Sequence, residues 1–223
     1  MMRKRQRKPV AATAEPLRDV AVTPLNRQQD AAIKAIERGV ITFLLGPAGT
    51  GKTHLACGWA VKAVADARVD RIVVTRPVVE AGESLGYLPG TYADKVAPYL
   101  MPIYDSIDKI AGRSGRRRDQ LNAATKIAPL AFMRGLTFDS AVVLVDEAQN
   151  CTLSQLRLVI SRLGNGSKMI ITGDIAQSDL PLREQALKTV VTKLSTVAGV
   201  EVFKFEASGI VRHPILQQVL ARL

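Results

Sequence analysis

The chain has 223 residues, of which 47% are hydrophobic and 23% are charged, a composition typical of a globular protein. This length suits one domain of average size with a short arm, and is short for two domains. No run approaches the roughly eighteen apolar residues of a membrane span, and the basic start at residues 1–8 lacks the apolar stretch of a secretory signal. We therefore expect a cytoplasmic protein with no membrane association. The two cysteines, Cys57 and Cys151, lack metal-ligand spacing and are predicted to be buried free thiols.

The net charge of +11 is concentrated in two short segments. Residues 1–8 hold five basic side chains and residues 113–118 hold four, with no acidic residue in either segment, so the rest of the chain is nearly neutral. Concentrated basic segments bind phosphate polymers by neutralising their charge, although many such segments are only solvated. We expect residues 1–8 and 113–118 to contact RNA or single-stranded DNA, with the solvated role as the alternative.

Short apolar segments alternate with helical patterns along most of the chain. After a flexible basic arm at residues 1–24, marked by three spaced prolines, residues 25–223 form a single predicted domain. Its first helix starts at the N-cap Asn26 and ends at Gly39. Strands are predicted at 40–45, 71–75, 141–145, 168–172 and 200–205, and further helices at 52–67, 153–163, 182–197 and 215–223. This alternation predicts an α/β fold with a mostly parallel sheet that is covered by helices on both faces.

The segment at about 77–138 interrupts this alternation and is predicted to be a helical insertion. It contains all four tyrosines of the chain, Tyr87, Tyr92, Tyr99 and Tyr104, and a helical stem from Tyr92 to Ile110. The tyrosines either pack this insertion or stack on the bases of a single-stranded nucleic acid beside the arginine-rich run. The sequence leaves both interpretations open.

Residues 46–53 carry the pattern G-x-x-x-x-G-K-[ST], a loop that binds the phosphates of a nucleoside triphosphate. A predicted strand precedes the loop and a predicted helix follows it, so that free backbone N–H groups and the positive helix end face the phosphates. The loop consists of Gly46, Pro47, Ala48, Gly49, Thr50, Gly51, Lys52 and Thr53. We expect Lys52 to reach the β and γ phosphates and the Thr53 hydroxyl to coordinate Mg²⁺.

Two adjacent acidic residues follow the strand predicted at 141–145. Asp146 is expected to hold the metal, and Glu147, which leaves the strand in another direction, to orient or deprotonate the attacking water. Gln177 follows the strand predicted at 168–172 and is expected at the same edge of the sheet, where ligands bind in open α/β folds. Gln29, near the start of the first helix, is a candidate to pair with adenine, and a solvent-facing role is the alternative.

Taken in order, these motifs resemble the PhoH-like family of phosphate-starvation-inducible ATPases, and they are also similar to the first motor domain of superfamily-one helicases. The matching segments run from about residue 24 to the end and include Gly46–Thr53, Thr75–Gly82, Leu85–Gly90, Asp146–Asn150, Gly173 and Asp174 with Gln177, Asp179–Pro181 and Val211–Pro214. The resemblance implies a RecA-like P-loop core, Mg²⁺-dependent ATP hydrolysis, and hexameric rings that act on RNA or single-stranded DNA, with helicase activity among the functions. It also implies catalytic or binding roles for Lys52, Thr53, Asp146, Glu147 and Gln177.

The chain shows no second motor domain, which in two-domain helicases supplies the arginine that stabilises the transition state. We therefore expect a neighbouring subunit of the ring to supply this arginine in trans. Arg212, in the matched segment Val211–Pro214, is the preferred candidate, and the others are Arg134, Arg162 and Arg76. An ATP-dependent switch that hydrolyses slowly and does not unwind is the alternative function. A phosphotransferase is disfavoured, because a kinase needs no water-activating glutamate next to Asp146.

Overall fold

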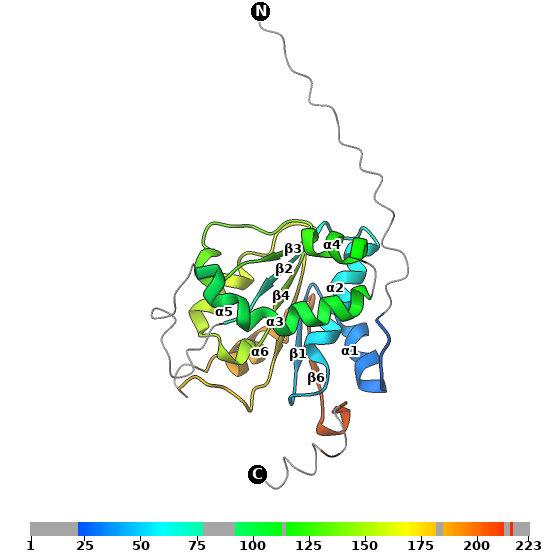
Figure 1. The fold of residues 1–223 in the computed structure, drawn as a ribbon. Coiled ribbons are helices and arrows are strands. Elements are labelled where there is room, and N and C mark those ends of the chain that lie inside the picture. The colour runs from blue at the N-terminus through cyan, green and yellow to red at the C-terminus, as the bar shows by residue number, and fades with distance from the viewer. Residues whose placement is uncertain (1–21, 78–91, 113–114, 182–184, 212–214, 216–223) are drawn as a thin grey trace, which may run out of the picture.

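The computed structural model describes residues 22–77, 92–112, 115–181, 185–211 and 215, and for residues 92–98 it describes the backbone alone. Three predicted parts lie wholly or largely outside these residues. They are residues 1–21 of the arm predicted at 1–24, the first part of the insertion with Tyr87, and nearly all of the helix predicted at 215–223. The described chain folds as a central sheet between layers of helices (Figure 1).

Six parallel strands form this sheet, in the order β3-β2-β4-β5-β1-β6. Their bounds are β1 Ile41–Leu45, β2 Arg71–Thr75, β3 Thr125–Ile127, β4 Ala141–Val145, β5 Lys168–Gly173 and β6 Val200–Lys204. Continuous runs of Val, Ile and Leu suit strands that are buried on both faces, and β4 is buried along its whole length. The register aligns Leu45 with Gly173 and Thr75 with Val145, so the ends of β1, β5, β2 and β4 lie at one edge of the sheet.

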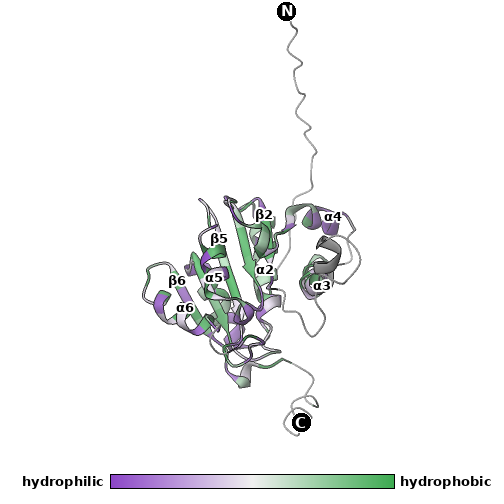
Figure 2. Cartoon of the chain, turned by 90° about the vertical axis from the view of Figure 1, so that its left-hand side faces the viewer, coloured by the Kyte–Doolittle hydropathy of each residue, from purple (hydrophilic) through white to green (hydrophobic). Residues whose placement is uncertain are grey.

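Helices cover both faces of the sheet, as the sequence predicts. On one face, α1 (Arg27–Arg38), α2 (Lys52–Ala65) and α3 (Tyr92–Ala111) share an apolar core with alternate strand residues such as Leu44. On the other face, α5 (Leu153–Ile160) and α6 (Leu187–Leu194) pack against the intervening strand residues such as Phe43. Figure 2 shows α3 and α4 on the opposite side of the sheet from α6. Among the described residues, no helix combines the length and apolar character needed to cross a bilayer.

The insertion is a helical unit at the β2 and β3 edge of the sheet. Its predicted stem is confirmed as α3, and the structure adds α4 (Gly115–Ala124), the edge strand β3 and a single 3₁₀ turn at Leu130–Phe132. Tyr104 is half-buried against the core of this face, and its burial raises the pKa of the phenol. The position of Tyr104 therefore supports the packing interpretation for this tyrosine.

The basic run at 113–118 lies largely on α4, which the sequence analysis did not predict as a helix. Arg113 is outside the described residues, and residues 115–118 form the first turn of α4. Figure 2 shows α4 as strongly hydrophilic, and Leu121 is its one buried residue. Arg118 forms an ion pair with Asp108 of α3, so part of the charge of this run is neutralised within the chain.

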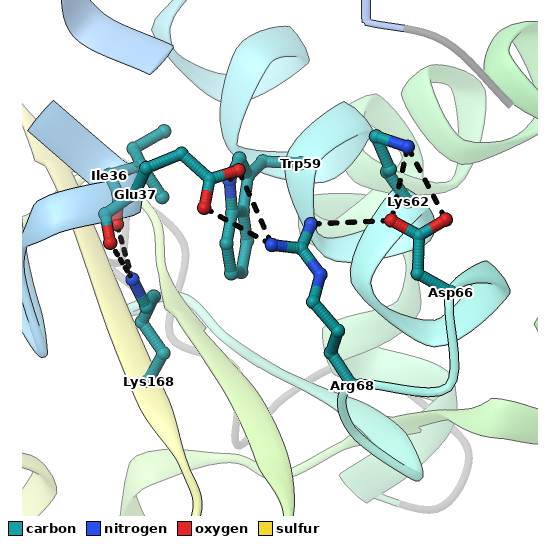
Figure 3. A network of polar contacts seen from close by, with 7 residues as sticks. All are labelled: Ile36, Glu37, Trp59, Lys62, Asp66, Arg68 and Lys168. Carbon is teal, nitrogen blue, oxygen red and sulfur yellow. Dashed lines mark hydrogen bonds and ion pairs between the residues drawn. The ribbon is translucent and has the colours of Figure 1, made fainter. Parts of the chain in front are cut away.

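A polar network joins α1, α2 and β5 at the edge of the sheet where β5 begins (Figure 3). The indole N–H of Trp59 donates to Glu37 at 2.8 Å, and Arg68 donates to the same carboxylate. Lys168 donates to the backbone carbonyls of Ile36 and Glu37 at the end of α1, where a cation stabilises the negative helix terminus. Arg68 and Lys168 each lie 4.8 Å from the Trp59 ring, which places the ring between two cations.

Candidate nucleotide-binding site

The loop between β1 and α2 lies where the strands of the sheet end, opposite the Trp59 network, which lies where β5 begins. Gly46 (φ +140°) and Gly51 (φ +87°) have backbone conformations that strongly favour glycine. A Cβ atom on Gly46 would lie 2.7 Å from the Phe205 carbonyl oxygen, and one on Gly51 would lie 2.8 Å from Nε2 of Gln29. The loop is also tied to β5, because the Gly46 N–H donates to the Gly173 carbonyl. These two glycines therefore allow the backbone to fit closely between its neighbours.

A cavity of about 580 Å³ opens between this loop, the ends of β2, β4 and β5, and one side of α3. It is lined by Ala48, Gly49, Gly51, Lys52, Thr53, His54, Arg76, Pro102, Ser106, Lys109, Asp146, Glu147, Thr172, Gly173, Asp174 and Gln177. The structure thus brings most of the predicted loop residues together with Asp146, Glu147 and Gln177 around one cavity.

Lys52, Thr53 and Asp146 lie at the base of the cavity in a hydrogen-bonded arrangement. Lys52 Nζ donates to the carbonyls of Gly46 and Pro47 at 2.7 and 2.9 Å, which holds the ammonium inside the loop. The Thr53 hydroxyl donates to Oδ1 of Asp146 at 2.8 Å. Asp146 is only 4% exposed, and the hydroxyl of Thr172 at the end of β5 donates to the same oxygen at 2.5 Å. Two hydroxyl donors therefore fix this carboxylate.

Glu147 departs from the line of β4 and turns toward the open part of the cavity. Its backbone lies in the left-handed region (φ +53°), and its side chain remains half-exposed. The amide of Gln149 donates to Oε2 of Glu147 at 2.5 Å and accepts from the backbone N–H of Asp174 at 3.0 Å. Gln149 thus connects Glu147 to the loop after β5.

Arg76, directly after β2, faces both acidic residues of its own chain. Its guanidinium nitrogens lie 3.7 Å from Oδ2 of Asp146 and 3.8 Å from Oε1 of Glu147. This orientation places Arg76 in the cavity of the chain that carries it. Its predicted role as a finger for a neighbouring subunit finds no support in this position.

The donors present fit a nucleoside triphosphate with Mg²⁺. Thr53 and Asp146 supply the hard oxygen ligands that Mg²⁺ prefers, and Mg²⁺ takes its other ligands from phosphates and water. Lys52 and the helix start at α2 supply positive charge for the phosphates.

The other predicted site residues occupy different positions. Gln177 is exposed at the rim of the cavity, whereas Gln29 is buried beneath the loop and donates to the Thr50 carbonyl at 3.1 Å. Arg134 is exposed, and Arg162 donates to the carbonyls of Leu136 and Leu158. Arg212 lies outside the described residues. The roles of Gln29, Gln177 and Arg212 stay predictions.

Several residues of the site were not predicted from the sequence. Gln149 lies within the matched segment Asp146–Asn150, and Thr172 is the last residue of a predicted strand. The signal available for both was a polar side chain near the end of a buried strand. Pro102, Ser106 and Lys109 reach the cavity only because α3 packs across α2, which no local pattern reveals. Burial and, secondarily, the charge of Lys109 lower the pKa of His54 on the first turn of α2.

Comparisons with known proteins show the family to which the chain belongs. The family model described as PhoH-like protein matches residues 21–223. The chain is 44% identical over 189 residues to a PhoH-like protein of Bacillus subtilis (strain 168), covering 84% of this chain and 59% of the relative. It is 47% identical over 189 residues to a PhoH-like protein of Synechocystis sp. (strain ATCC 27184 / PCC 6803 / Kazusa), covering 84% and 58%. The chain therefore spans less than two thirds of the length of these relatives.

A solved structure shares the fold. The large terminase from a thermophilic bacteriophage superposes with a TM-score of 0.56 at 12% identity, covering 90% of this chain and 50% of the terminase chain. At this identity the likeness concerns the fold alone, a RecA-like P-loop core. From its family match, its relatives and the loop geometry, the chain belongs to the PhoH-like family of P-loop nucleotide-binding proteins.

Proposed function

We propose that this chain hydrolyses ATP in a Mg²⁺-dependent reaction and that the hydrolysis is coupled to a nucleic acid. The observation that carries the first part is the contact between Thr53 and Asp146 at 2.8 Å, next to Lys52 and below the half-exposed Glu147. Phosphoryl transfer to water needs positioned charge and a placed nucleophile more than covalent chemistry. This arrangement supplies both requirements in one cavity.

Each residue has a distinct task in this proposal. Thr53 and Asp146 hold the metal, and bound Mg²⁺ supplies positive charge against the β and γ phosphates. Lys52 binds phosphate oxygens from inside the loop, and Glu147 orients the attacking water and accepts its proton. Gln177 at the rim and Arg76 beside the acidic pair are placed to contact the terminal phosphate.

ATP turnover by the wild type and by Glu147→Gln, each with and without single-stranded RNA and DNA, tests this function. We expect Mg²⁺-dependent turnover, a loss of at least about a hundredfold in the variant, and stimulation of the wild type by one of the polymers. Turnover that no nucleic acid changes would support instead an ATP-dependent switch, and no turnover under any condition would refute the ATPase. Retained nucleotide binding by Glu147→Gln shows that the variant is folded.

The nucleic-acid part of the proposal is supported by the position of α4. Arg116 is exposed and Arg117 is half-buried on this hydrophilic helix, which lies at the edge of the molecule. Replacing Arg116 and Arg117 together by alanine is expected to reduce the dependence of log K on log salt by about 0.7 for each lost phosphate contact with a single strand. Arg157→Ala on α5 is the control. An unchanged salt dependence in the double variant would show that α4 does not contact the nucleic acid.

We also propose a hexameric ring in which Arg212 completes the neighbouring subunit's site. The support is the family membership and the position of Arg76, which faces its own chain. Light scattering of the purified protein with and without nucleotide gives the subunit number. A monomer at micromolar concentration in the presence of nucleotide would contradict the ring.

A further inference from the structure

Three carboxamide side chains at the start of α1 have both of their polar ends engaged inside the protein. Asn26 accepts from the Gln29 N–H at 2.9 Å and donates to the Gly209 carbonyl at 3.4 Å. Gln28 donates to the Ser208 hydroxyl at 2.9 Å and accepts from the Glu206 N–H at 2.9 Å. These contacts join the start of α1 to the segment that follows β6.

Gln29 contacts the segment before α1 with one end of its amide and the phosphate loop with the other. It accepts from the Leu25 N–H at 2.8 Å and donates to the Thr50 carbonyl at 3.1 Å. Its amide also lies against Gly51, where no Cβ atom could fit. Gln29 is 3% exposed, so the donor and acceptor capacity that remains on its amide is closed to a ligand.

The segment after β6 contacts the loop from another direction. The Phe205 carbonyl lies against Gly46, and the Val211 N–H donates to the Gly49 carbonyl at 2.9 Å. The loop is therefore supported by two elements, and Asn26 and Gln28 hold these two elements to each other. A loop that is fixed in this way presents its N–H groups without a large ordering cost when phosphates bind.

The cavity is rich in cations that suit phosphates. Its lining contains Lys52, Arg76 and Lys109, and among the described lining residues the imidazole of His54 is the one aromatic ring. A glutamine that reads adenine must present both its amide oxygen and its amide nitrogen to the base edge. In Gln29 both atoms are turned to the backbone of its own chain.

We propose that Asn26, Gln28 and Gln29 form a brace for the phosphate loop, and that Gln29 acts on the triphosphate through this loop instead of pairing with adenine. This inference rests on the nucleotide site of the proposed function. Its consequence is that the site selects nucleoside triphosphates by their phosphates and accepts guanine as well as adenine. Gln29 is then a positioning residue, and its predicted pairing with adenine is replaced by a structural contact.

Calorimetric binding of three probes to the full chain with Mg²⁺ tests the proposal. The probes are the non-hydrolysable imido analogues of ATP and GTP, and inorganic tripolyphosphate, which has no base. The wild type is expected to bind the two analogues within about threefold of each other, whereas a base-reading glutamine would separate them by about tenfold or more. Gln29→Ala is expected to weaken all three probes by a similar factor of about ten, because it leaves the buried Thr50 and Leu25 groups unpaired.

Gln29→Glu serves as a second variant, since it keeps the acceptor for the Leu25 N–H and loses the donor to Thr50. It is expected to weaken the three probes in parallel. The control Gln155→Ala, which removes a carboxamide from the capping box at the start of α5, is expected to leave all three unchanged. The proposal is overturned if wild-type binding is strongly selective for adenine, or if a Gln29 variant loses the ATP analogue and keeps tripolyphosphate binding. Circular dichroism shows whether each variant is folded. The comparison of the ATP and GTP analogues on the wild type does not depend on the folding of any variant. Equal binding of both analogues without any ATP turnover would contradict the proposed hydrolysis and leave the brace supported.

Discussion

Asp146 and Glu147 are neighbours in the chain, but different contacts hold their carboxylates. Asp146 is buried, and the hydroxyls of Thr53 and Thr172 donate to one of its oxygens. Glu147 leaves the strand through a left-handed backbone conformation and stays half-exposed, with one oxygen bound by Gln149. A fixed buried oxygen suits a metal ligand, whereas a half-exposed carboxylate in reach of solvent suits the activation of water. The two roles therefore follow from one turn of the backbone.

Gln149 is expected to position Glu147 for the reaction. Gln149→Ala removes the donor to Glu147, and Gln149→Glu removes this donor while keeping the acceptor for the Asp174 N–H. Both variants are expected to lower kcat for ATP hydrolysis by about tenfold or more, because a mobile carboxylate holds water poorly. The dissociation constant for the nucleotide should change less than about twofold, since Gln149 does not line the cavity. A loss of nucleotide affinity with normal kcat would show that Gln149 only supports the fold.

The lowered pKa of His54, to which Lys109 contributes, makes the stability of the protein depend on pH with a definite sign. Burial, with a smaller contribution from the Lys109 charge, lowers the pKa of His54 below its ordinary value of 6.5. Between the lowered pKa and 6.5 the unfolded chain binds more protons than the folded chain, so this contribution to stability is present above pH 6.5 and is lost as the pH falls through the folded pKa. Lys109→Met is expected to raise the pKa of His54 without restoring it to 6.5, because burial is the larger cause.

An NMR titration of the His54 ring measures this shift directly. The chain has one other histidine, His213, and its replacement by glutamine assigns the signals. Lys126→Met, a cation on the edge strand β3, serves as the control and should leave the titration unchanged. A His54 pKa that does not move in Lys109→Met would mean that α3 does not bring its lysine to the cavity.

Among the helices and strands, those with an apolar run or an apolar periodicity in the sequence could be predicted. β1, β2, β4 and β5 were predicted because each is largely a run of buried apolar residues within the sheet. The edge strand β6, with apolar residues at Val200, Val202 and Phe203, and the helical stem that corresponds to α3 were also predicted. The edge strand β3 has three residues, Thr125, Lys126 and Ile127, none of them fully buried, so it has no apolar run. The helix α4 buries only Leu121 and therefore has no apolar stripe. The strand β3 depends on pairing with β2, which lies far away in the sequence, and α4 packs against the preceding helix α3.

The same limit applies to the site. The loop residues and Asp146 follow directly after predicted strands, and parallel strands bring their ends to one edge, so this part could be predicted. The wall formed by Pro102, Ser106 and Lys109 depends on the path of α3 over α2. Within the helix predicted at 182–197, α6 begins at Leu187 after the non-helical residues 185 and 186, and residues 182–184 lie outside the described part of the chain.

The Trp59 network is expected to stabilise the junction of α1, α2 and β5 without affecting the site. Trp59→Phe removes the N–H that donates to Glu37 and reduces the packing between Arg68 and Lys168. We expect a loss of about 1–3 kcal/mol in the free energy of unfolding. Nucleotide affinity should be unchanged, because Lys168 of the network lies at the start of β5 and the cavity lies at the end of this strand. Urea unfolding measures this loss of stability. It is followed by circular dichroism and not by tryptophan fluorescence, because Trp59 is the only tryptophan of the chain and the variant lacks it.

Lys34→Ala, which removes an exposed ion pair with Asp30 on the same helix α1, is the matched control and should cost less than about 0.5 kcal/mol. Equal stability of Trp59→Phe and the wild type would show that the indole N–H and the two cations contribute no net stability.

In the proposed ring, each nucleotide site uses one arginine of its own subunit, Arg76, and receives a second arginine, Arg212, from a neighbouring subunit. Arg76 faces Asp146 and Glu147 of the same chain, so a subunit with Arg76→Ala and a subunit with Glu147→Gln each contain a defective site. Mixing these two variants is expected to restore no ATP turnover, because no site then has both residues in one chain. Arg212 is proposed to act across the interface, so mixing Arg212→Ala with Glu147→Gln should pair an intact Glu147 with a neighbour's intact Arg212.

For random assembly from equal parts, such an intact pair forms at roughly one interface in four, so the second mixture should regain up to about a quarter of the wild-type turnover. Each variant is measured alone as the baseline, and light scattering confirms that the mixtures assemble to the same size as the wild type. Restored turnover in the Arg76 mixture would place this arginine in the neighbouring site, against the geometry of the described chain. Restoration in neither mixture, with assembly intact, would rule out Arg212 as the residue supplied in trans and leave Arg134 and Arg162, which lie outside the cavity, as the next variants to mix.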